Sequence, residues 1–197
     1  MVQLVYFLML PTILPKSDLF PILLHLTSLT DESKRLRFGY VPSDTAIINY
    51  VKNSTSSHGS LWYGYMVDGG CIGAMHISIM GDTAELGISI TESHRGKGLS
   101  SALFDRALVY LKAMRIKNIS LQCLNENAIV IHLAKKHGLS IKSIGGGEKE
   151  ATGSIELNDP LIARLQDANS DFWSLVDFYI RNQSHLCKTL NFKQKLL

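Results

Sequence analysis

The sequence predicts an α/β fold built on one mixed β-sheet. Three segments between residues 61 and 90 have strand-like composition, and turns at residues 68–70 (Asp-Gly-Gly) and 81–82 (Gly-Asp) separate them. Strands joined by such short turns pair antiparallel, so this stretch is expected to form a meander. From residue 98 onward helical and strand patterns alternate, and a strand reached through a helix can pair parallel to its predecessor. The sequence therefore predicts an antiparallel meander followed by β-α-β-α units, an α+β arrangement in a single mixed sheet.

The segment before the meander is expected to add one strand and three helical elements to this sheet. Apolar runs, serine-aspartate pairs that cap helices, and a glycine break near residue 39 mark their limits. The expected elements are a buried strand at 5–10, an apolar helix that ends near 29 and is capped by Ser17-Asp18, a charged helical turn at 30–35, and a helix at 43–51 capped by Ser43-Asp44. The helices are expected to pack on one face of the sheet.

The second half of the chain continues the pattern. The expected elements are a helix at 98–114, a strand at 119–124, a helix at 127–136 that ends at Gly138, and strands at 139–144 and 153–157. We expect one domain over residues 1–158 and a helical C-terminal extension over 159–197, which carries Phe172, Trp173 and Tyr179 at helical spacing. Packing on the same chain is the simplest use of those aromatic side chains, and a homodimer contact or a wall of the acceptor pocket are the alternatives.

Composition excludes several function classes. A net charge of +3 with scattered basic residues predicts no nucleic-acid surface. The apolar first ten residues lack a basic start and meet Pro11 too soon to span a bilayer, so no membrane association is expected. Three widely spaced cysteines support neither a disulfide framework nor a zinc site, so the sequence predicts a cytoplasmic protein without a bound metal.

The loop Arg95-Gly96-Lys97-Gly98-Leu99-Ser100 joins the last strand of the meander to the next helix. In such a loop several backbone N–H groups and the helix dipole converge on one anion, and phosphate is the natural ligand. Gly96 and Gly98 let the backbone approach that ligand, while Arg95 and Lys97 add positive charge at the rim. The alternative is an ordinary strand-to-helix turn with a solvated basic pair.

The segment T-A-E-L-G-I-S-I-T-E-S-H-R-G-K-G-L-S-S-A-L-F resembles the signature of the GNAT superfamily of N-acetyltransferases. That family binds the pyrophosphate of coenzyme A with an R/Q-x-x-G-x-G/A loop, and Ser100 stands where the family usually has Gly or Ala. The resemblance also implies that the preceding strand pairs with the pantetheine arm through its main chain. It implies acetyl-CoA as cosubstrate and the following cofactor-binding residues: Ile88, Ser89, Ile90, Arg95, Gly96, Lys97, Gly98, Leu99, Ser100 and Asn127.

Asn127 enters this set through a second block, L-Q-C-L-N-E-N-A-I-V-I-H-L-A-K-K-H-G-L, which resembles the family's N-x-x-A-x-x-L-Y-x-x-x-G-F helix. Asn127 is expected to reach the pantetheine, to cap this helix, or to do both. The tyrosine that the family often uses to reprotonate the coenzyme A thiolate is replaced by Ala134. That acid is therefore water, another residue, or absent, with His132 and His137 as minor candidates.

Glu85 and His76 are the candidate catalytic residues. If residues 81–82 form a type II′ turn, Met80 faces Thr83 and His76 faces Gly87, which makes His76 and Glu85 diagonal neighbours on a polar face. Attack on a thioester requires a neutral amine, so a base must remove a proton from the ammonium. The resemblance implies a glutamate on this strand as that base. The alternative is that the two side chains form a structural pair on a solvated face.

The sequence therefore predicts an acetyl-CoA-dependent N-acetyltransferase that acetylates a primary amine of a small molecule or a protein by direct attack in a ternary complex. The acceptor is not identified, although Arg35 or Arg37 can hold an anionic group on it. Cys123 as an acyl-carrying nucleophile is a minor alternative. The rival from another class is a non-catalytic acyl-CoA-binding regulatory module with the same fold. Residues 36–40 and 43–51 also resemble a bacterial GNAT group without an assigned substrate.

Overall fold

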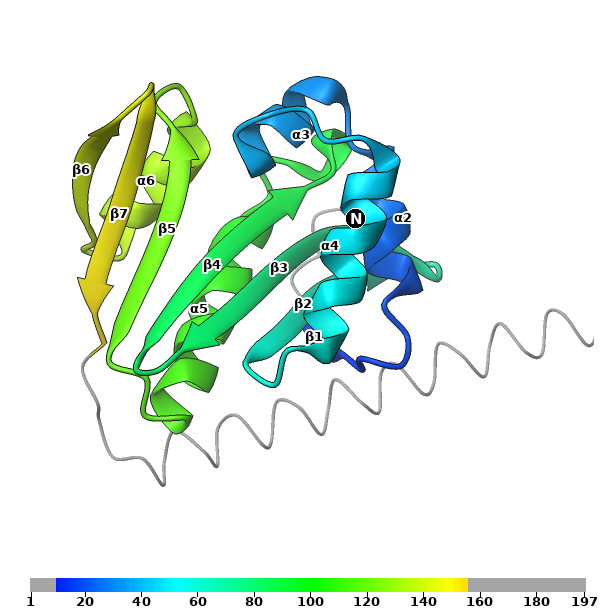
Figure 1. Ribbon diagram of the computed structural model, residues 1–197, viewed down its shortest axis with the longest axis horizontal. Helices are drawn as coiled ribbons and strands as arrows, with labels where there is room; N and C mark the ends of the chain where they lie inside the picture. The colour runs from blue at the N-terminus through cyan, green and yellow to red at the C-terminus, as the bar shows by residue number, and fades with distance from the viewer. Residues whose placement is uncertain (1–9, 156–197) are drawn as a thin grey trace, which may run out of the picture.

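The computed structural model describes residues 10–155, which form a seven-stranded mixed sheet in the order β1-β2-β3-β4-β5-β7-β6 (Figure 1). The predicted mixed fold is confirmed. In chain order the elements are β1 Thr12–Leu14, α2 Phe20–Ser28, α3 Asp31–Phe38, α4 Asp44–Ser56, β2 Ser60–Val67, β3 Gly70–Met80, β4 Thr83–Ile90, the 3-10 turn η1 Glu92–His94, α5 Leu99–Ala113, β5 Asn118–Leu124, α6 Ala128–Lys136, β6 Ser140–Gly145 and β7 Glu148–Ser154.

Strands β2, β3 and β4 form the predicted antiparallel meander. Asp68 and Gly69 both have positive φ angles (49° and 82°), as a type I′ hairpin turn requires. In the second hairpin only Gly81 has a positive φ (63°), which matches the predicted type II′ turn. The register is also as predicted, because Met80 pairs with Thr83 and His76 pairs with Gly87.

Strands β4 and β5 pair in parallel only at their beginnings, from Thr83 with Asn118 to Glu85 with Ser120. Beyond Glu85 the two strands separate, and Figure 1 shows them diverging toward α3. Because β5 pairs along its full length with β7, the sheet is divided into two halves that open at this point. The opening leaves the second half of β4 without a neighbouring strand on one side.

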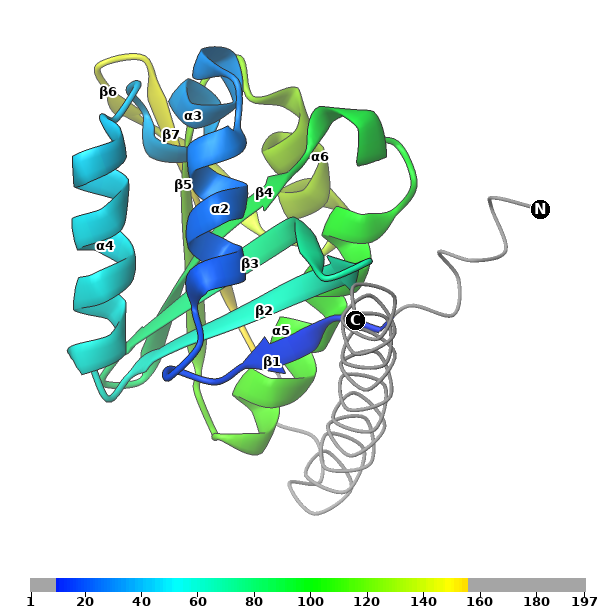
Figure 2. The same ribbon diagram turned by 90° about the vertical axis from the view of Figure 1, so that its right-hand side faces the viewer.

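Helices cover both faces of the sheet, with α2 and α4 on one face and α5 and α6 on the other (Figure 2). The larger core lies under α5 and α6, where Phe104 and Leu103 pack fully buried against Met75 and Ile77 of β3. The smaller core lies under α2 and α4 around Trp62, which is 2% exposed. Side chains that alternate along β2 and β3 therefore serve two different cores.

Several expected element boundaries differ from the structure. The cap of the first helix is Leu19, not Ser17-Asp18, and no side chain bonds to its free N–H groups. Pro21 explains the shift, because proline is tolerated in the first turn of a helix, where an N–H has no partner. The helix predicted to end at residue 51 continues to Ser56.

The strand predicted at 153–157 begins earlier, at Glu148. The polar residues at its start did not indicate a strand. In the structure β7 lies between β5 and β6, and main-chain pairing on both edges stabilises it. The strand predicted at 5–10 falls almost wholly outside the described residues, and β1 forms at Thr12–Leu14 instead.

Other predictions concern parts of the chain that the structure does not describe. The C-terminal extension at 159–197, its aromatic side chains and a homodimer contact through it all lie outside residues 10–155. Within the described residues no helix is both long and apolar enough to cross a membrane. The same residues contain no group of three or more histidine, cysteine or acidic side chains placed to hold a metal ion.

Candidate active site

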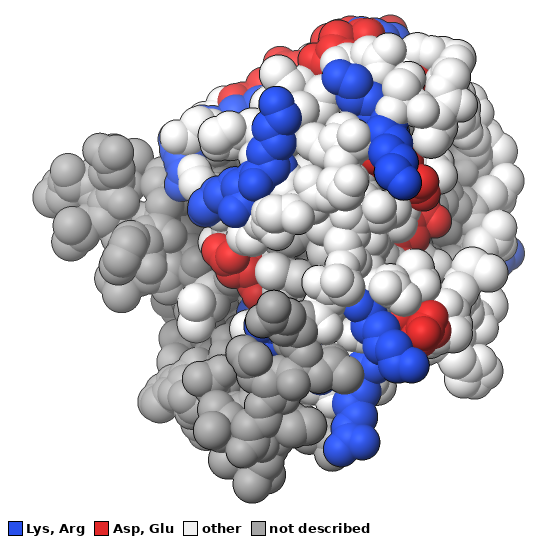
Figure 3. Space-filling model, turned by 90° about the vertical axis from the view of Figure 1, so that its left-hand side faces the viewer, with Lys and Arg blue, Asp and Glu red and all other residues white. Residues whose placement is uncertain are grey.

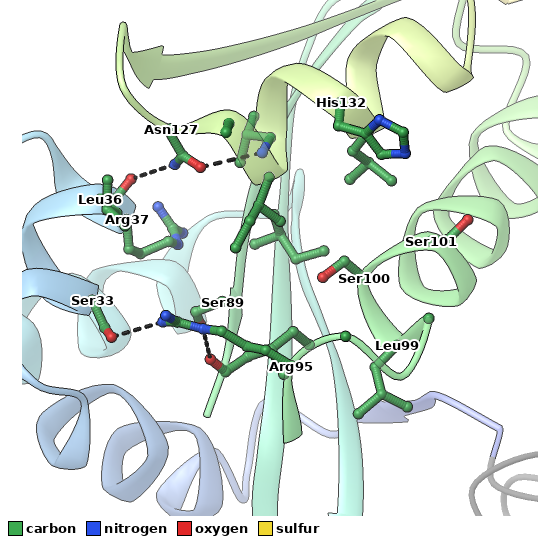
Figure 4. A pocket seen from close by; sticks show the side chains of 18 of the residues that line it. Ser33, Leu36, Arg37, Ser89, Arg95, Leu99, Ser100, Ser101, Asn127 and His132 are labelled. Carbon is green, nitrogen blue, oxygen red and sulfur yellow. Dashed lines mark hydrogen bonds between the residues drawn. The ribbon is translucent and has the colours of Figure 1, made fainter. Parts of the chain in front are cut away.

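A cavity of about 570 Å³ opens where β4 separates from β5, and α3, α5 and α6 surround it (Figure 4). It is lined by nine of the ten residues predicted to bind the cofactor, namely Ile88, Ser89, Ile90, Arg95, Gly96, Gly98, Leu99, Ser100 and Asn127. The tenth, Lys97, does not line it, and its Nζ donates to the carbonyl oxygen of Ser93 at 3.1 Å. The structure therefore brings together main-chain segments and helix ends that are far apart in the sequence.

The N-terminus of α5 carries no side-chain cap. Its N-cap Gly98 has a φ of 78°, and Gly96 in the preceding loop has a φ of 72°. Within residues 10–155 the N–H groups of Gly96, Gly98, Leu99 and Ser100 donate to no protein acceptor. The N–H of Arg95 is different, because it donates to the carbonyl oxygen of Glu92 at 3.1 Å. A 15-residue helix thus presents unpaired donors and its positive dipole end to the cavity.

The structural reason for the two glycines is their backbone conformation. A β-carbon at Gly96 or Gly98 would meet no atom within 4 Å, so the protein itself does not crowd these positions. Positive φ angles are costly for other residues, and here they turn successive N–H groups toward the same space. The close approach predicted at Gly96 and Gly98 is therefore an approach of the ligand to the backbone, and not of another part of the protein.

The free edge of β4 forms the long wall of the cavity. The N–H of Thr91 donates to Ile72 in β3, and pairs along an antiparallel ladder alternate between bonded and non-bonded. Ser89 and Gly87 therefore exchange hydrogen bonds with β3, whereas the main-chain groups of Ile88 and Ile90 point toward the opening. The Ile90 carbonyl oxygen accepts from the Arg95 side chain. The other groups can pair with an extended ligand as a neighbouring strand would.

Arg95 fastens the loop to α3. Its Nη2 donates to Ser33 Oγ at 2.7 Å and its Nε donates to the carbonyl oxygen of Ile90 at 3.2 Å, as Figure 4 shows. Glu92 accepts hydrogen bonds from Thr30 and Ser33, which lower the pKa of its carboxyl group. The contact between Arg95 and Ser33 could not be predicted from local sequence patterns, because the two residues are 62 positions apart.

Asn127 is the predicted cap of α6. Its Oδ1 accepts from the N–H of Val130 at 3.2 Å, and its Nδ2 donates to the carbonyl oxygen of Leu36 at 3.1 Å. Both ends of the amide are therefore used to join α6 to α3 across the cavity. Asn127 borders the cavity, and the capping alternative holds for its side chain.

The outer end of the cavity contains residues that were not predicted to bind the cofactor. Ser101 of α5 and Lys136 of α6 line it, and the Lys136 ammonium donates to the Ser101 hydroxyl. His132 also lines it, whereas His137 and Ala134 do not. Helical periodicity would have placed His132 and Lys136 four residues apart on one side of α6, facing the loop.

Basic side chains form no continuous field on the face shown in Figure 3. Lys and Arg residues lie apart there, with uncharged surface and acidic residues between them. Sequence-independent binding to nucleic acid needs several basic groups along a phosphate backbone. The face in Figure 3 therefore shows no basic surface of that kind.

A second cavity, of about 390 Å³, lies on the other side of the opening and is bordered by α3, α4, β3, β4 and β5. Leu36, Arg37, Ile88 and Val130 line both cavities, so the two spaces meet at these residues. Both predicted catalytic residues, His76 and Glu85, line the second cavity. Arg37 is the one charged residue among the four at the junction.

His76 and Glu85 do not meet. His76 Nδ1 lies 2.7 Å from the Tyr50 hydroxyl, its Nε2 lies 2.6 Å from Ser60 Oγ, and its ring stacks on Trp62 at 4.4 Å. Burial, assisted by the charge of Arg37, lowers the pKa of His76 to about 3. Glu85 is exposed and makes no hydrogen bond or ion pair within the described residues. His76 is therefore a neutral side chain with both nitrogens engaged.

The two candidate arginines are placed differently. Arg35 pairs with Glu32 and Glu126 on the surface, which raises its pKa, and it lines neither cavity. Arg37 lies at the junction, and its Nη2 donates to the Tyr50 hydroxyl at 2.9 Å. Of the two, only Arg37 is available to a ligand.

The sequence matches the family model described as the acetyltransferase (GNAT) family over residues 26–139, more than half of the chain. The chain belongs to the GNAT acetyltransferase family. The predicted membership is confirmed, and members of this family are acyltransferases. The matched region runs from α2 to the end of α6 and contains the loop at α5, the free edge of β4 and most residues of both cavities.

Solved GNAT structures have the same fold. The GNAT domain of PAT from S. lividans is 20% identical, with a TM-score of 0.63 over 73% of this chain and 88% of that one. The spermidine N-acetyltransferase from Vibrio cholerae, solved with CoA and spermine, is 19% identical, with a TM-score of 0.59 over 74% and 94%. The PaiA N-acetyltransferase from Thermoplasma acidophilum, solved with coenzyme A, is 18% identical, with a TM-score of 0.56 over 72% and 95%. No curated protein matches the sequence.

Proposed function

We propose that this GNAT protein transfers an acetyl group from acetyl-CoA to a primary amine. The observation that supports this most directly is the uncapped N-terminus of α5, whose unpaired N–H groups line a cavity that continues along the free edge of β4. A diphosphate at the helix end and an extended arm along the strand make one elongated ligand. Two neighbours of similar fold were solved with coenzyme A, which agrees with this assignment.

In this proposal the thioester of that ligand lies at the junction of the two cavities. An arm that starts at the loop and follows β4 reaches Ile88, where the first cavity meets the second. The second cavity then holds the acceptor. A binding site in each half of the opening allows both substrates to be present together, as direct transfer requires.

In the proposed step the amine nitrogen attacks the thioester carbon, a C–N bond forms and the C–S bond breaks. The ammonium of the acceptor gives up one proton before the attack, and the nitrogen loses a second proton as the amide forms. Coenzyme A leaves as a thiolate and takes up that second proton, directly or through water. We propose that Glu85 is the base that accepts the proton lost before the attack. Its carboxylate lines the acceptor cavity and has no partner within the described residues. Ala134 is fully buried and lines neither cavity, so it contributes nothing to thiolate protonation.

In this proposal His76 does not act as a proton acceptor for the substrate. Arg37 donates to the Tyr50 hydroxyl, so the Tyr50 proton is directed to His76 Nδ1, and Nε2–H donates to Ser60. A neutral histidine held in this way orients Tyr50 beside Arg37. We therefore propose His76 as a positioning residue.

Cys123 offers a competing route through an acyl-enzyme. It lines the acceptor cavity, but burial raises the pKa of its thiol, so the reactive thiolate is disfavoured. No histidine partner for it is found within the described residues. Direct transfer between the two bound substrates therefore has the better support.

The test measures coenzyme A thiol released from acetyl-CoA with a panel of primary amines. We expect turnover by the wild type and a loss of at least about 100-fold in kcat for Glu85→Gln, as for removal of a general base. The matched control is Glu150→Gln, a carboxylate on β7 that lines neither cavity. Activity unchanged in Glu85→Gln would refute the base assignment, and tight acetyl-CoA binding without turnover on any amine would favour the non-catalytic module.

A further inference from the structure

Arg37 carries a positive charge at the junction of the two cavities, and the described part of the protein supplies no ion-pair partner for it. The guanidinium makes one hydrogen bond within residues 10–155, from Nη2 to the Tyr50 hydroxyl, and no ion pair. Its Nε is buried without a hydrogen-bond partner among those residues. A buried donor without an acceptor is costly, so such groups in native proteins point to a missing partner.

The packing around Arg37 holds it in one orientation. Its Cζ lies 4.9 Å from the centre of the Phe38 ring and 5.8 Å from that of Tyr50. It also lies against Gly87, where a β-carbon would come within 2.2 Å of Nη2. Tyr50 is in turn held by His76. A fixed guanidinium plane suits a planar, bidentate partner.

Carboxylates are present in the same cavity, but none of them pairs with Arg37. Glu85 of β4 and Glu148 of β7 both line the second cavity, and neither forms an ion pair with it in the described part of the chain. The charge of Arg37 instead lowers the pKa of His25 and of His76, in each case as a smaller cause beside burial. The cavity therefore keeps a positive group and two negative groups apart.

We infer that the acceptor is a small free amino acid, whose carboxylate binds Arg37 while its amine faces Glu85. This inference rests on the proposed function and narrows its substrate class. A molecule with both charges matches a cavity that separates a guanidinium from carboxylates. The volume of about 390 Å³ also suits a small molecule. A protein N-terminus or a lysine side chain lacks the nearby carboxylate and leaves Arg37 unpaired.

The test compares amino acids with their primary amides as acetyl acceptors. An amide keeps the amine and the shape but removes the negative charge, so we expect kcat/KM for the acid to exceed that for the amide by at least about 10-fold. Arg37→Gln should reduce this ratio to within about threefold by lowering kcat/KM for the acid alone. Arg35→Gln is the matched control, because Arg35 is on the same helix and lines neither cavity.

A binding measurement keeps the inference separate from the proposed function. With coenzyme A present, an N-acetyl amino acid should bind more tightly than its N-acetyl amide in calorimetry, and Arg37→Gln should remove the difference. This result would support the inference even if no amine were acetylated, which would refute only the proposed reaction. Equal use and equal binding of acid and amide by the wild type would overturn the inference. An equal loss of kcat/KM for the acid and the amide in Arg37→Gln would also overturn it, and would place Arg37 at the thioester.

Discussion

The guanidinium of Arg37 rests against the backbone of Gly87, on the strand that lines both cavities. A β-carbon at position 87 would lie 2.2 Å from Nη2 and 2.4 Å from Cζ. Gly87 has no positive φ angle, so the backbone itself accepts alanine there. The absence of a side chain at position 87 is therefore a requirement of Arg37, which must occupy that space.

Gly87→Ala is expected to displace Arg37 while the fold is preserved. The atoms that would clash belong to the end of a flexible side chain, so the free energy of unfolding should change by less than about 1 kcal/mol. The kcat/KM for the acceptor should fall by at least about 10-fold, and the Kd for coenzyme A should stay within about twofold. Gly70→Ala, where a β-carbon would make only an ordinary contact at 3.5 Å, is the control for steady-state kinetics. Wild-type kinetics in Gly87→Ala would contradict the conclusion that Arg37 requires the absence of a side chain at position 87.

Gly98→Ala tests the loop at residues 95–100, which we propose binds the diphosphate of coenzyme A. Alanine at a φ of 78° costs roughly 1–2 kcal/mol and tilts the free N–H groups of the first turn of α5. We expect a loss of stability and a Kd for coenzyme A raised by about 10-fold in calorimetry. Gly145→Ala places the same strain (φ of 90°) at a hairpin residue that lines neither cavity, and should lose stability without weakened binding. Similar effects of both substitutions on coenzyme A would show that strain alone is responsible.

Lys136→Ala should weaken coenzyme A binding by about fivefold, because an exposed ammonium at the cavity rim contributes a modest, salt-dependent attraction to phosphate. The adjacent Lys135 lines neither cavity, so Lys135→Ala should bind as the wild type does. Calorimetry at low and high salt measures both variants. An equal effect of the two lysines would indicate general attraction by surface charge.

The stability of the fold is expected to decrease in acid because of two histidines. Burial lowers the pKa of His25 to about 4 and that of His76 to about 3, from 6.5 in the unfolded chain. As the pH falls below the histidine pKa of the unfolded chain, these side chains bind protons in the unfolded chain but not in the folded protein. The free energy of unfolding should therefore decrease by up to about 1.4 kcal/mol per pH unit for each histidine, down to the folded pKa.

Denaturant unfolding between about pH 7 and about pH 4.5 measures this slope. His25→Asn should flatten it, whatever its effect on stability at neutral pH. Met80→Gln, a neutral change on an exposed turn, serves as the control. A slope that is the same in His25→Asn and the wild type would contradict the assignment.

Local patterns were sufficient for the elements that local interactions determine. Ser43 caps α4 and Thr30 caps α3 through their own side chains, and the glycine at position 81 sets the second hairpin turn and its register. These features depend on residues within a few positions of one another, so the sequence shows them directly. The loop at α5 was recognisable for the same reason.

The contacts that give the site its character depend on residues far apart in the chain. Periodicity placed His76 and Glu85 on the same face of two neighbouring strands, but it did not show that α4 lies over that face and brings Tyr50 to the His76 ring. In the same way Arg37 looked like any exposed arginine until α3 was placed over the opening between β4 and β5.

The sequence by itself determined the mixed sheet, the meander register and the glycine-containing loop before α5, because each follows from backbone preferences and side-chain alternation over short distances. The tertiary structure decided which charged groups are neutralised and which are left for a ligand. That outcome depends on burial and on partners from distant segments, and only the packed chain defines them.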